Sequence, residues 1–359
     1  MKNTYRFGRA TLVLSLLALA GLANAQSSAT VYGIVDAGLR SGDGLDSAYA
    51  ASAGSATVVN SGINTTSRLG YRGAEDLGAG LQAIFNFESG LNVDAGAPVN
   101  AAKFFDRASV VGLKGEWGTL TVGRQTTLLA DINGQVDPLS SRFASFNPNI
   151  AIASISAHRL GAEYGPSGAS TGSFRLDNSI KYVTQFGGFS ARFMHALGEQ
   201  TGNDSNLSST GVGVGYQKDV FTGTLAYQQF KGATGLNLNA YFGGVSAMLG
   251  KGRIALTYAN HEAETTLTSK TTNTTLGAGG TIPLKENLDV IVTYYQVNRS
   301  RTASVDDGFS RVISFLEYKL SNRTLVYVEA DQTSWRDGYQ AVGMKKDASG
   351  VSLGLLHRF

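Results

Sequence analysis

Charged side chains alternate with apolar ones in the stretch SRLGYRGAEDLGAGLQAIFNFE, which spans residues 67–88. Arg68 and Arg72 share one face of a strand here, because successive side chains of a strand point to opposite faces. After the break GAEDLGAG, a second alternating segment ends on Glu88. Guanidinium groups that face a carboxylate across a water-filled space create a field that orients polar solutes and sorts ions.

Other kinds of chemistry find little support in the residue types. The chain has no cysteine, and its four histidines are His158, His195, His261 and His357. None stands in an arrangement specific to a catalytic triad, and the sequence HEAE at His261 lacks the second histidine of a zinc motif. We therefore expect neither an enzyme nor a bound metal or other cofactor.

The first 25 residues, MKNTYRFGRATLVLSLLALAGLANA, combine a basic start, an apolar run and the ending Ala-Asn-Ala. This pattern is typical of a secretory signal peptide, and its apolar run is shorter than the ~20 residues of a spanning helix, which disfavours a retained anchor. Cleavage after Ala25 would leave residues 26–359 as a single domain. Because the signal holds three of the 30 basic residues and none of the 27 acidic ones, that domain is neutral, and we expect no nucleic-acid partner.

The elements that carry these residues read as strands. Glycine occurs 45 times and proline five times, and apolar residues recur at every second position in about sixteen segments between residues 29 and 359. Short turns such as GEWG, FGG and GKG alternate with longer polar loops. This organisation predicts an all-β fold, a 16-stranded antiparallel transmembrane β-barrel around a water-filled channel. A soluble β-sandwich is the alternative, since a mean hydropathy of -0.05 suits both.

Two further segments support the barrel. Residues 125–177 interrupt the strand series, and a connection this long is functional, disordered or a sign of wrongly assigned strands. We expect it to be the third long loop, folded into the pore, where water can hydrogen-bond to its backbone. The chain ends in GVSLGLLHRF, with apolar residues at alternate positions before Phe359. Such an ending is typical of substrates of the outer-membrane barrel assembly machinery, so Phe359 is the expected assembly signal.

Several stretches together carry a family resemblance: SSATVYGIVDAGL, SRLGYRGAEDLGAGLQAIFNFE, RASVVGLKGEWGTLTVGRQ, RLDNSIKYVTQFGGFSARF and LLHRF. They resemble the trimeric general porins of Gram-negative outer membranes, especially the β-proteobacterial branch. The resemblance covers almost the whole chain after the signal. It implies a homotrimer of sixteen-stranded barrels in the outer membrane, in contact with lipid and lipopolysaccharide, with loop 3 of each barrel folded into its pore.

The resemblance also implies which residues line the narrowest section of the pore. Three arginines match the family's cluster by motif position, namely Arg68 of SRLG, Arg107 of DRASVVGL and Arg175 of RLDNSI. Glu88 of FNFE matches an acidic lining residue. Arg72 and Arg124 extend the basic set, and Asp131 and Asp137 are the expected loop acids.

The expected function is passive diffusion of small hydrophilic solutes and ions without energy input. The arginine cluster predicts a weak preference for anions, because guanidinium groups stay charged even when several are crowded together. A substrate-specific outer-membrane channel is the alternative, for which rows of aromatic residues or a ladder of basic residues along the pore would be expected.

Overall fold

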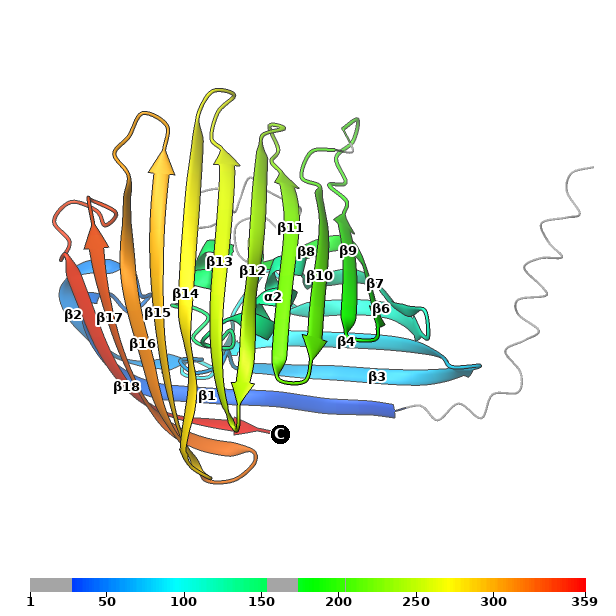
Figure 1. The fold of residues 1–359 in the computed structure, drawn as a ribbon, viewed down its shortest axis with the longest axis horizontal. Helices are drawn as coiled ribbons and strands as arrows, with labels where there is room; N and C mark the ends of the chain where they lie inside the picture. The colour runs from blue at the N-terminus through cyan, green and yellow to red at the C-terminus, as the bar shows by residue number, and fades with distance from the viewer. Residues whose placement is uncertain (1–27, 154–173, 204) are drawn as a thin grey trace, which may run out of the picture.

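The computed structural model describes residues 28–153, 174–203 and 205–359, so the predicted signal peptide lies outside the described residues. Almost every element is a strand (Figure 1). The strands are β1 (Ser28–Leu45), β2 (Ala51–Ser61), β3 (Arg68–Gly78), β4 (Leu81–Asn92), β5 (Ala97–Pro98), β6 (Ala108–Gly115), β7 (Gly118–Thr126), β8 (Arg175–Phe186), β9 (Phe189–Ala196), β10 (Ser209–Lys218), β11 (Phe221–Lys231), β12 (Asn237–Leu249), β13 (Gly252–Glu264), β14 (Lys270–Lys285), β15 (Leu288–Arg301), β16 (Asp307–Lys319), β17 (Thr324–Arg336) and β18 (Asp347–Arg358). Two helices, α2 (Leu128–Val136) and α3 (Pro148–Ala153), lie between β7 and β8.

The strands form one closed antiparallel barrel. Each long strand pairs with its neighbour in sequence, and β18 pairs with β1 to close the ring, with Leu39 opposite Leu353. Both β2 and β3 pair with β1, β3 with its first half and β2 with its second half, so together they fill one position of the wall. The two-residue β5 pairs only with the end of β4. The wall therefore has sixteen positions, and the predicted sixteen-stranded barrel is confirmed.

The first long connection differs from the sequence-based expectation. Alternation in the sequence predicts strands at residues 29–40 and 67–73 with a connection between them, but β1 continues to Leu45 and β2 returns along it from Ala51. Glycine, serine and alanine dominate this hairpin, so its sequence lacks the alternation of large apolar side chains that marks the other strands. Backbone pairing between β1 and β2 keeps these small residues extended.

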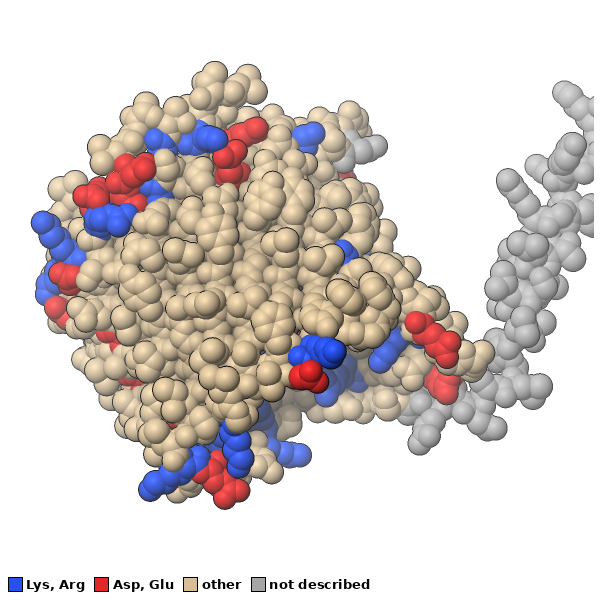
Figure 2. Space-filling model, in the orientation of Figure 1, with Lys and Arg blue, Asp and Glu red and all other residues tan. Residues whose placement is uncertain are grey.

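The two sides of the wall differ in chemistry. Val245, Leu256 and Leu353 are exposed, as are the other large apolar side chains at alternate positions of their strands. Residues between them are buried and often polar, such as Thr257 and Ser352. The view in Figure 2 shows a broad outer band without charged residues, with Lys, Arg, Asp and Glu gathered at both rims. This distribution is typical of a barrel that faces lipid outside and water inside.

Aromatic side chains border this band at the end with the short turns. Trp117 stacks on Tyr182 with ring centroids 6.0 Å apart, and Phe186 stacks on Phe189 at 5.8 Å. Trp117 lies at the turn that joins β6 to β7, Phe186 and Phe189 flank the turn that joins β8 to β9, and Tyr182 lies on β8. Aromatic girdles of this kind mark the two membrane interfaces in barrels, so the pairs locate one of them.

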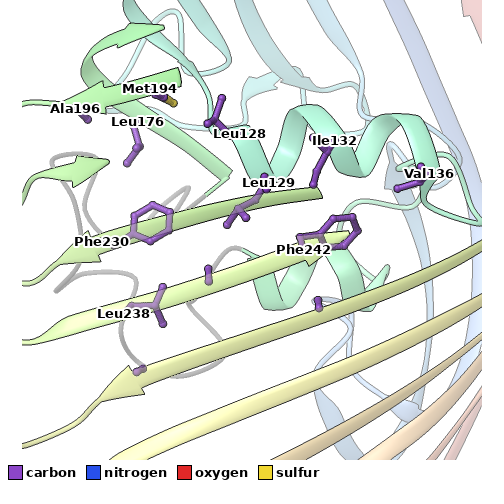
Figure 3. Packing of buried hydrophobic residues seen from close by; sticks show 14 residues of the cluster. Leu128, Leu129, Ile132, Val136, Leu176, Met194, Ala196, Phe230, Leu238 and Phe242 are labelled. Carbon is purple, nitrogen blue, oxygen red and sulfur yellow. The ribbon is translucent and has the colours of Figure 1, made fainter. Parts of the chain in front are cut away.

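Helix α2 packs on the inner side of the wall (Figure 3). Thr127 caps its N-terminus by accepting a hydrogen bond from the Ala130 amide at 3.2 Å. The helix buries Leu129 and Ile132 among side chains that alternate with the exposed ones, Phe230 of β11 and Phe242 of β12 among them. Among the described residues, no helix is long and apolar enough to cross a membrane.

Candidate functional site

Three of the predicted charges form one contiguous group. Glu88 lies on β4 with Arg68 on the neighbouring β3, and its Oε2 atom is 3.7 Å from Arg68 Nε. Arg107, which directly precedes β6, places its Nε 2.5 Å from the other carboxylate oxygen, Oε1. Glu88 is therefore held between two guanidinium groups on three adjacent elements of the wall.

Tyr32 of β1 completes the contacts of Glu88, and sequence reasoning missed it. Its hydroxyl oxygen lies 2.9 Å from Glu88 Oε2 and 2.9 Å from Asn86 Oδ1, so the hydroxyl can donate a hydrogen bond to either oxygen. The ring lies across Gly70, where a Cβ atom would come within 2.4 Å of Tyr32 Cζ. Gly70 in SRLGYRG thus gives Tyr32 room to reach the carboxylate. Gly70 lies midway between Arg68 and Arg72, on the same face of the strand, and a glycine at such a position is the sequence signal that could have indicated a large neighbouring side chain.

The cluster extends toward β7 and β8. Arg175 Nε donates to the Arg107 carbonyl at 3.0 Å, which joins it to the Glu88 group. Arg124 is buried, with Nη1 2.6 Å from Asp177 Oδ1. The β7 register shifts between Gly123 and Gln125, so strict alternation does not hold at Arg124.

Besides Asp177, two more charged residues join this cluster without having been predicted. Lys103 forms an ion pair with Asp177, and the buried Asp106 accepts a hydrogen bond from the Gly90 amide at 2.6 Å. Both lie in or beside loop segments in which apolar and polar residues do not alternate, so the strand pattern of the sequence gave no basis for selecting them. We call Arg68, Arg107, Arg124, Arg175, Lys103, Glu88, Asp106 and Asp177 the basic cluster, in which five cations outnumber three carboxylates.

Arg72 lies apart from these ion pairs. It shares the face of Arg68 on β3 but is closer to the short turn that leads to β4, and its side chain is exposed. Its guanidinium carbon is 5.0 Å from the centroid of the Tyr32 ring, a cation–π contact. The tyrosine therefore lies between Arg72 and the carboxylate of Glu88.

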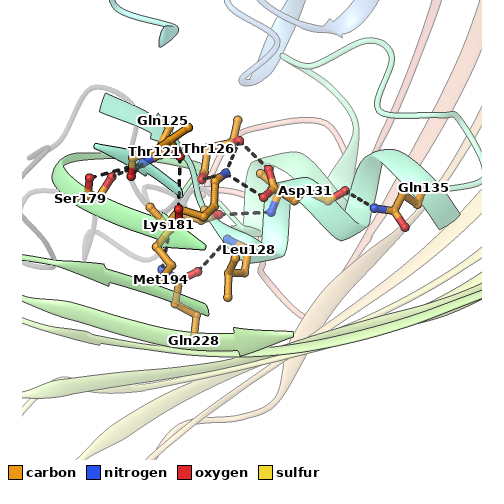
Figure 4. A network of polar contacts seen from close by, with 12 residues as sticks. Thr121, Gln125, Thr126, Leu128, Asp131, Gln135, Ser179, Lys181, Met194 and Gln228 are labelled. Atoms are coloured by element: carbon orange, nitrogen blue, oxygen red, sulfur yellow. Dashed lines mark hydrogen bonds and ion pairs between the residues drawn. The ribbon is translucent and has the colours of Figure 1, made fainter. Parts of the chain in front are cut away.

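The two predicted loop acids have different surroundings. Asp131, in the first turn of α2, pairs with Lys181 of β8 at 2.8 Å and accepts from the Thr126 hydroxyl at 2.6 Å (Figure 4). Its side chain remains 20% exposed. This pair fixes the start of α2 to the wall, and Lys181 is a further inner charge that sequence reasoning did not select.

Asp137, at the C-terminal end of α2, is fully buried. Its carboxylate accepts hydrogen bonds from the Asn147 and Asn149 amides at 3.0 and 2.8 Å, from the Tyr295 hydroxyl at 3.0 Å and from the Ser141 backbone at 2.7 Å. Burial raises the pKa of Asp137 above its ordinary value in spite of these four donors. Its position thus serves to hold residues 137–149 against β15.

A second charged group lies beneath the segment that follows α2. Arg40 of β1 pairs with Asp331 of β17 at 2.6 Å and with Glu329 at 3.0 Å, all three nearly excluded from solvent. Phe146 covers this group, with the guanidinium carbon of Arg311 3.5 Å from its ring centroid. The buried Arg40 and Glu329 have no obvious sequence signal, because their partner contacts link the first strand to the last ones.

The described residues contain no group of three or more His, Cys, Asp or Glu side chains that could hold a metal ion. The arrangement is instead a fixed set of charges on the inner side of a closed wall. Such charges attract or repel ions without forming or breaking covalent bonds.

Comparison with known proteins gives an independent view. A family profile described as Gram-negative porin matches residues 10–338. The curated relatives include an outer membrane porin protein of Bordetella pertussis, 33% identical over 50% of this chain and 45% of its own length. Outer membrane porin protein 32 of Delftia acidovorans is 34% identical over 63% of this chain and 61% of its own length. The chain thus spans about half to three fifths of the length of these two relatives.

A solved structure covers more of the chain. The anion-selective porin from Comamonas acidovorans superposes with a TM-score of 0.77 and 26% sequence identity, over 93% of this chain and all of its own. A trimer form of OmpT from Vibrio cholerae superposes with a TM-score of 0.68 at 16% identity, over 93% of this chain and 99% of its own, and shows a shared fold.

Proposed function

Because the chain belongs to the Gram-negative porin family, an outer-membrane family, we propose that it is a water-filled channel for passive diffusion of small hydrophilic solutes and ions. A closed sixteen-position wall with a polar inner side supports this proposal. Family and fold are those of a channel rather than an enzyme. Passive diffusion through the channel that this wall encloses requires neither a cofactor nor energy input.

We further propose that the channel weakly prefers anions. The observation that carries this proposal is the excess of cations in the basic cluster, five against three carboxylates. Arg68, Arg107 and Arg175 are the proposed lining residues, with Arg124 and Arg72 as extensions and Glu88 and Asp131 as the acidic members. The name of the anion-selective porin that superposes on this chain is consistent with the same preference.

The segment between β7 and β8 is the proposed constriction. Helix α2 packs on the inner side chains of β11 and β12, and Phe143 and Phe146 pack beside β16 and β17. A segment that follows the inner side of the wall from β9 to β17 leaves less room for solutes. Asp137, as a buried group, is proposed to anchor this segment rather than to line the pore.

A KCl gradient across a planar bilayer tests the ion preference. The expected reversal potential has the sign of the chloride equilibrium potential. A reversal potential with the sign of the potassium equilibrium potential would refute the anion preference. A purified protein that never conducts would refute the channel itself.

The proposed assembly is a homotrimer in which each barrel conducts by itself. The exposed apolar outer side supplies the surface that subunits or lipid must cover. Closure of single insertions in three equal conductance steps is the expected behaviour, whereas single-step closure would indicate an independent monomer.

A further inference from the structure

A polar cavity that shares no residue with the basic cluster lies on the inner side of the wall. It has a volume of about 360 Å³ and opens between β8, β9, β10 and β11 near their short turns. Its polar lining consists of Gln135, Gln185, Ser190, Arg192, Gln217 and Thr222. A volume of this size is typical of a pocket for a small solute.

Strand alternation places these side chains inside the barrel. Phe189 and Phe193 of β9 are 53% and 45% exposed on the outer side, so Ser190 and Arg192 between them point inward. Gln135, on the last turn of α2, contributes to the cavity from the side of the helix. The cavity thus lies between the helix and the turn end of the barrel.

Gly215 of β10 provides the space in front of Arg192. A Cβ atom at this position would lie 2.7 Å from Ser190 Oγ and 3.5 Å from Arg192 Nη1. The inner wall is therefore recessed where the guanidinium lies. Any larger residue at Gly215 would fill the room that a solute could occupy.

The charge of the cavity is positive and unopposed by its own lining. None of its lining residues is an Asp or Glu, and within the described chain Arg192 makes a single hydrogen bond, to Ser190 Oγ at 3.2 Å. A guanidinium presents paired donors that match a carboxylate, and three glutamine amides with two hydroxyls can bond to hydroxyl groups.

We propose that Arg192 and its neighbours form a binding subsite for small hydroxy-carboxylates on the turn side of α2. The proposal deepens the proposed channel function, since it names a class of anionic solute that pauses after passing the helix. A neutral sugar of the same size would lack the charged contact with Arg192 and bind more weakly. The basic cluster would play no part in this binding.

Ligand-observed NMR titration of the purified full-length protein in detergent tests the subsite independently of conductance. Gluconate is the probe and glucose the neutral control. We expect Arg192→Gln to weaken gluconate binding by about tenfold or more, because a charged hydrogen-bonded contact is lost. Arg192→Lys should restore part of the affinity, and Lys218→Gln, which removes an exposed charge at the same end of β10, should change it less than twofold.

Three results would overturn the subsite. One is equal binding of gluconate and glucose to the unmodified protein, which includes the absence of binding by both. Another is unchanged gluconate affinity in Arg192→Gln. The third is loss of binding in Arg68→Ala/Arg107→Ala, which would place gluconate at the basic cluster. Because binding is measured without a membrane, a protein that binds gluconate but fails to conduct KCl would refute the channel function alone.

Discussion

Glu88 neutralises part of the positive charge of Arg68 and Arg107 on the inner side of the wall. Its two carboxylate oxygens contact Arg107 at 2.5 Å and Arg68 at 3.7 Å, and its side chain is 14% exposed. Tyr32 donates to the same carboxylate. Replacing Glu88, Arg68 or Arg107 with a neutral residue therefore changes the net charge near the wall by a known sign.

Removal of the carboxylate should strengthen anion preference. In Glu88→Gln the side chain keeps its size but loses its charge, so Arg68 and Arg107 are no longer neutralised. We expect the anion-to-cation permeability ratio to rise on the order of twofold in a KCl reversal-potential measurement. Glu262→Gln, which removes a carboxylate paired with Lys270 on exposed residues, is the matched control and should leave the ratio unchanged.

Removal of the arginines should act in the opposite direction. Arg68→Ala with Arg107→Ala leaves Glu88 uncompensated, and the reversal potential should move toward the potassium value, with the permeability ratio falling roughly twofold or more. Arg299→Ala with Arg301→Ala is the matched pair, since those two arginines also share one carboxylate, Asp307. An identical shift in both double variants would mean that the basic cluster has no special place in selectivity.

At the scale of elements, polar contacts anchor the segment between β7 and β8 to several strands of the wall. Asp131 ties the start of α2 to Lys181, and Asp137 ties its end to Tyr295 of β15. Arg253 of β13 adds a third anchor, because its guanidinium donates to the carbonyls of Gln135 and Asp137 at 2.8 and 2.9 Å. These contacts oppose the conformational entropy of a long connection.

Asp137→Ala should loosen this segment. The change leaves four donors without their acceptor in a buried place and should lower the free energy of unfolding by about 2–4 kcal/mol. It should also raise single-channel current noise and speed protease cleavage after Arg142 of this segment. Asp43→Ala removes an exposed carboxylate paired with Lys345 and should change none of these. Unchanged noise and cleavage in Asp137→Ala would show that the segment does not depend on the Asp137 carboxylate.

At the scale of the whole molecule, closure of the ring joins the two ends of the described chain. The Phe359 amide donates to the Gly33 carbonyl at 3.1 Å, and the Gly33 amide donates to the Phe359 carbonyl at 3.1 Å. The Phe359 ring lies over Gly33, where a Cβ atom would come within 2.4 Å of its Cζ. The Phe359 ring therefore occupies space that is free only because residue 33 is a glycine.

Phe359 packs on Gly33, and variants can separate this contact from the proposed role of Phe359 as an assembly signal. If the ring is the proposed assembly signal, Phe359→Ala should lower the outer-membrane yield severalfold in cells yet fold from urea into detergent in vitro. Gly33→Ala, which keeps Phe359 but displaces its ring, should slow folding in both settings because the close contact is lost. Heat-modifiable migration on gels measures both. Normal cellular yield of Phe359→Ala would contradict the signal role.

The sequence alone determined the elements of this protein and part of its site. Apolar residues at every second position, and short turns that alternate with long loops, predicted a sixteen-stranded barrel, because the backbone fixes the direction of each side chain along a strand. The same parity placed Arg68 and Glu88 on one side of neighbouring strands, where they form an ion pair. It did not reveal the Gly/Ser/Ala hairpin of β1 and β2, in which small residues carry no pattern.

Only the tertiary structure decided which charges meet. Lys103 and Asp177 pair across 74 residues of sequence, and Arg40 and Glu329 across 289, since closing a barrel brings distant strands together. A register shift beside Arg124 defeated strict alternation, and Asp137 is buried because α2 ends against β15. Local backbone geometry thus fixed the strands and their faces, whereas ring closure and the packing of one long connection fixed the charged neighbours.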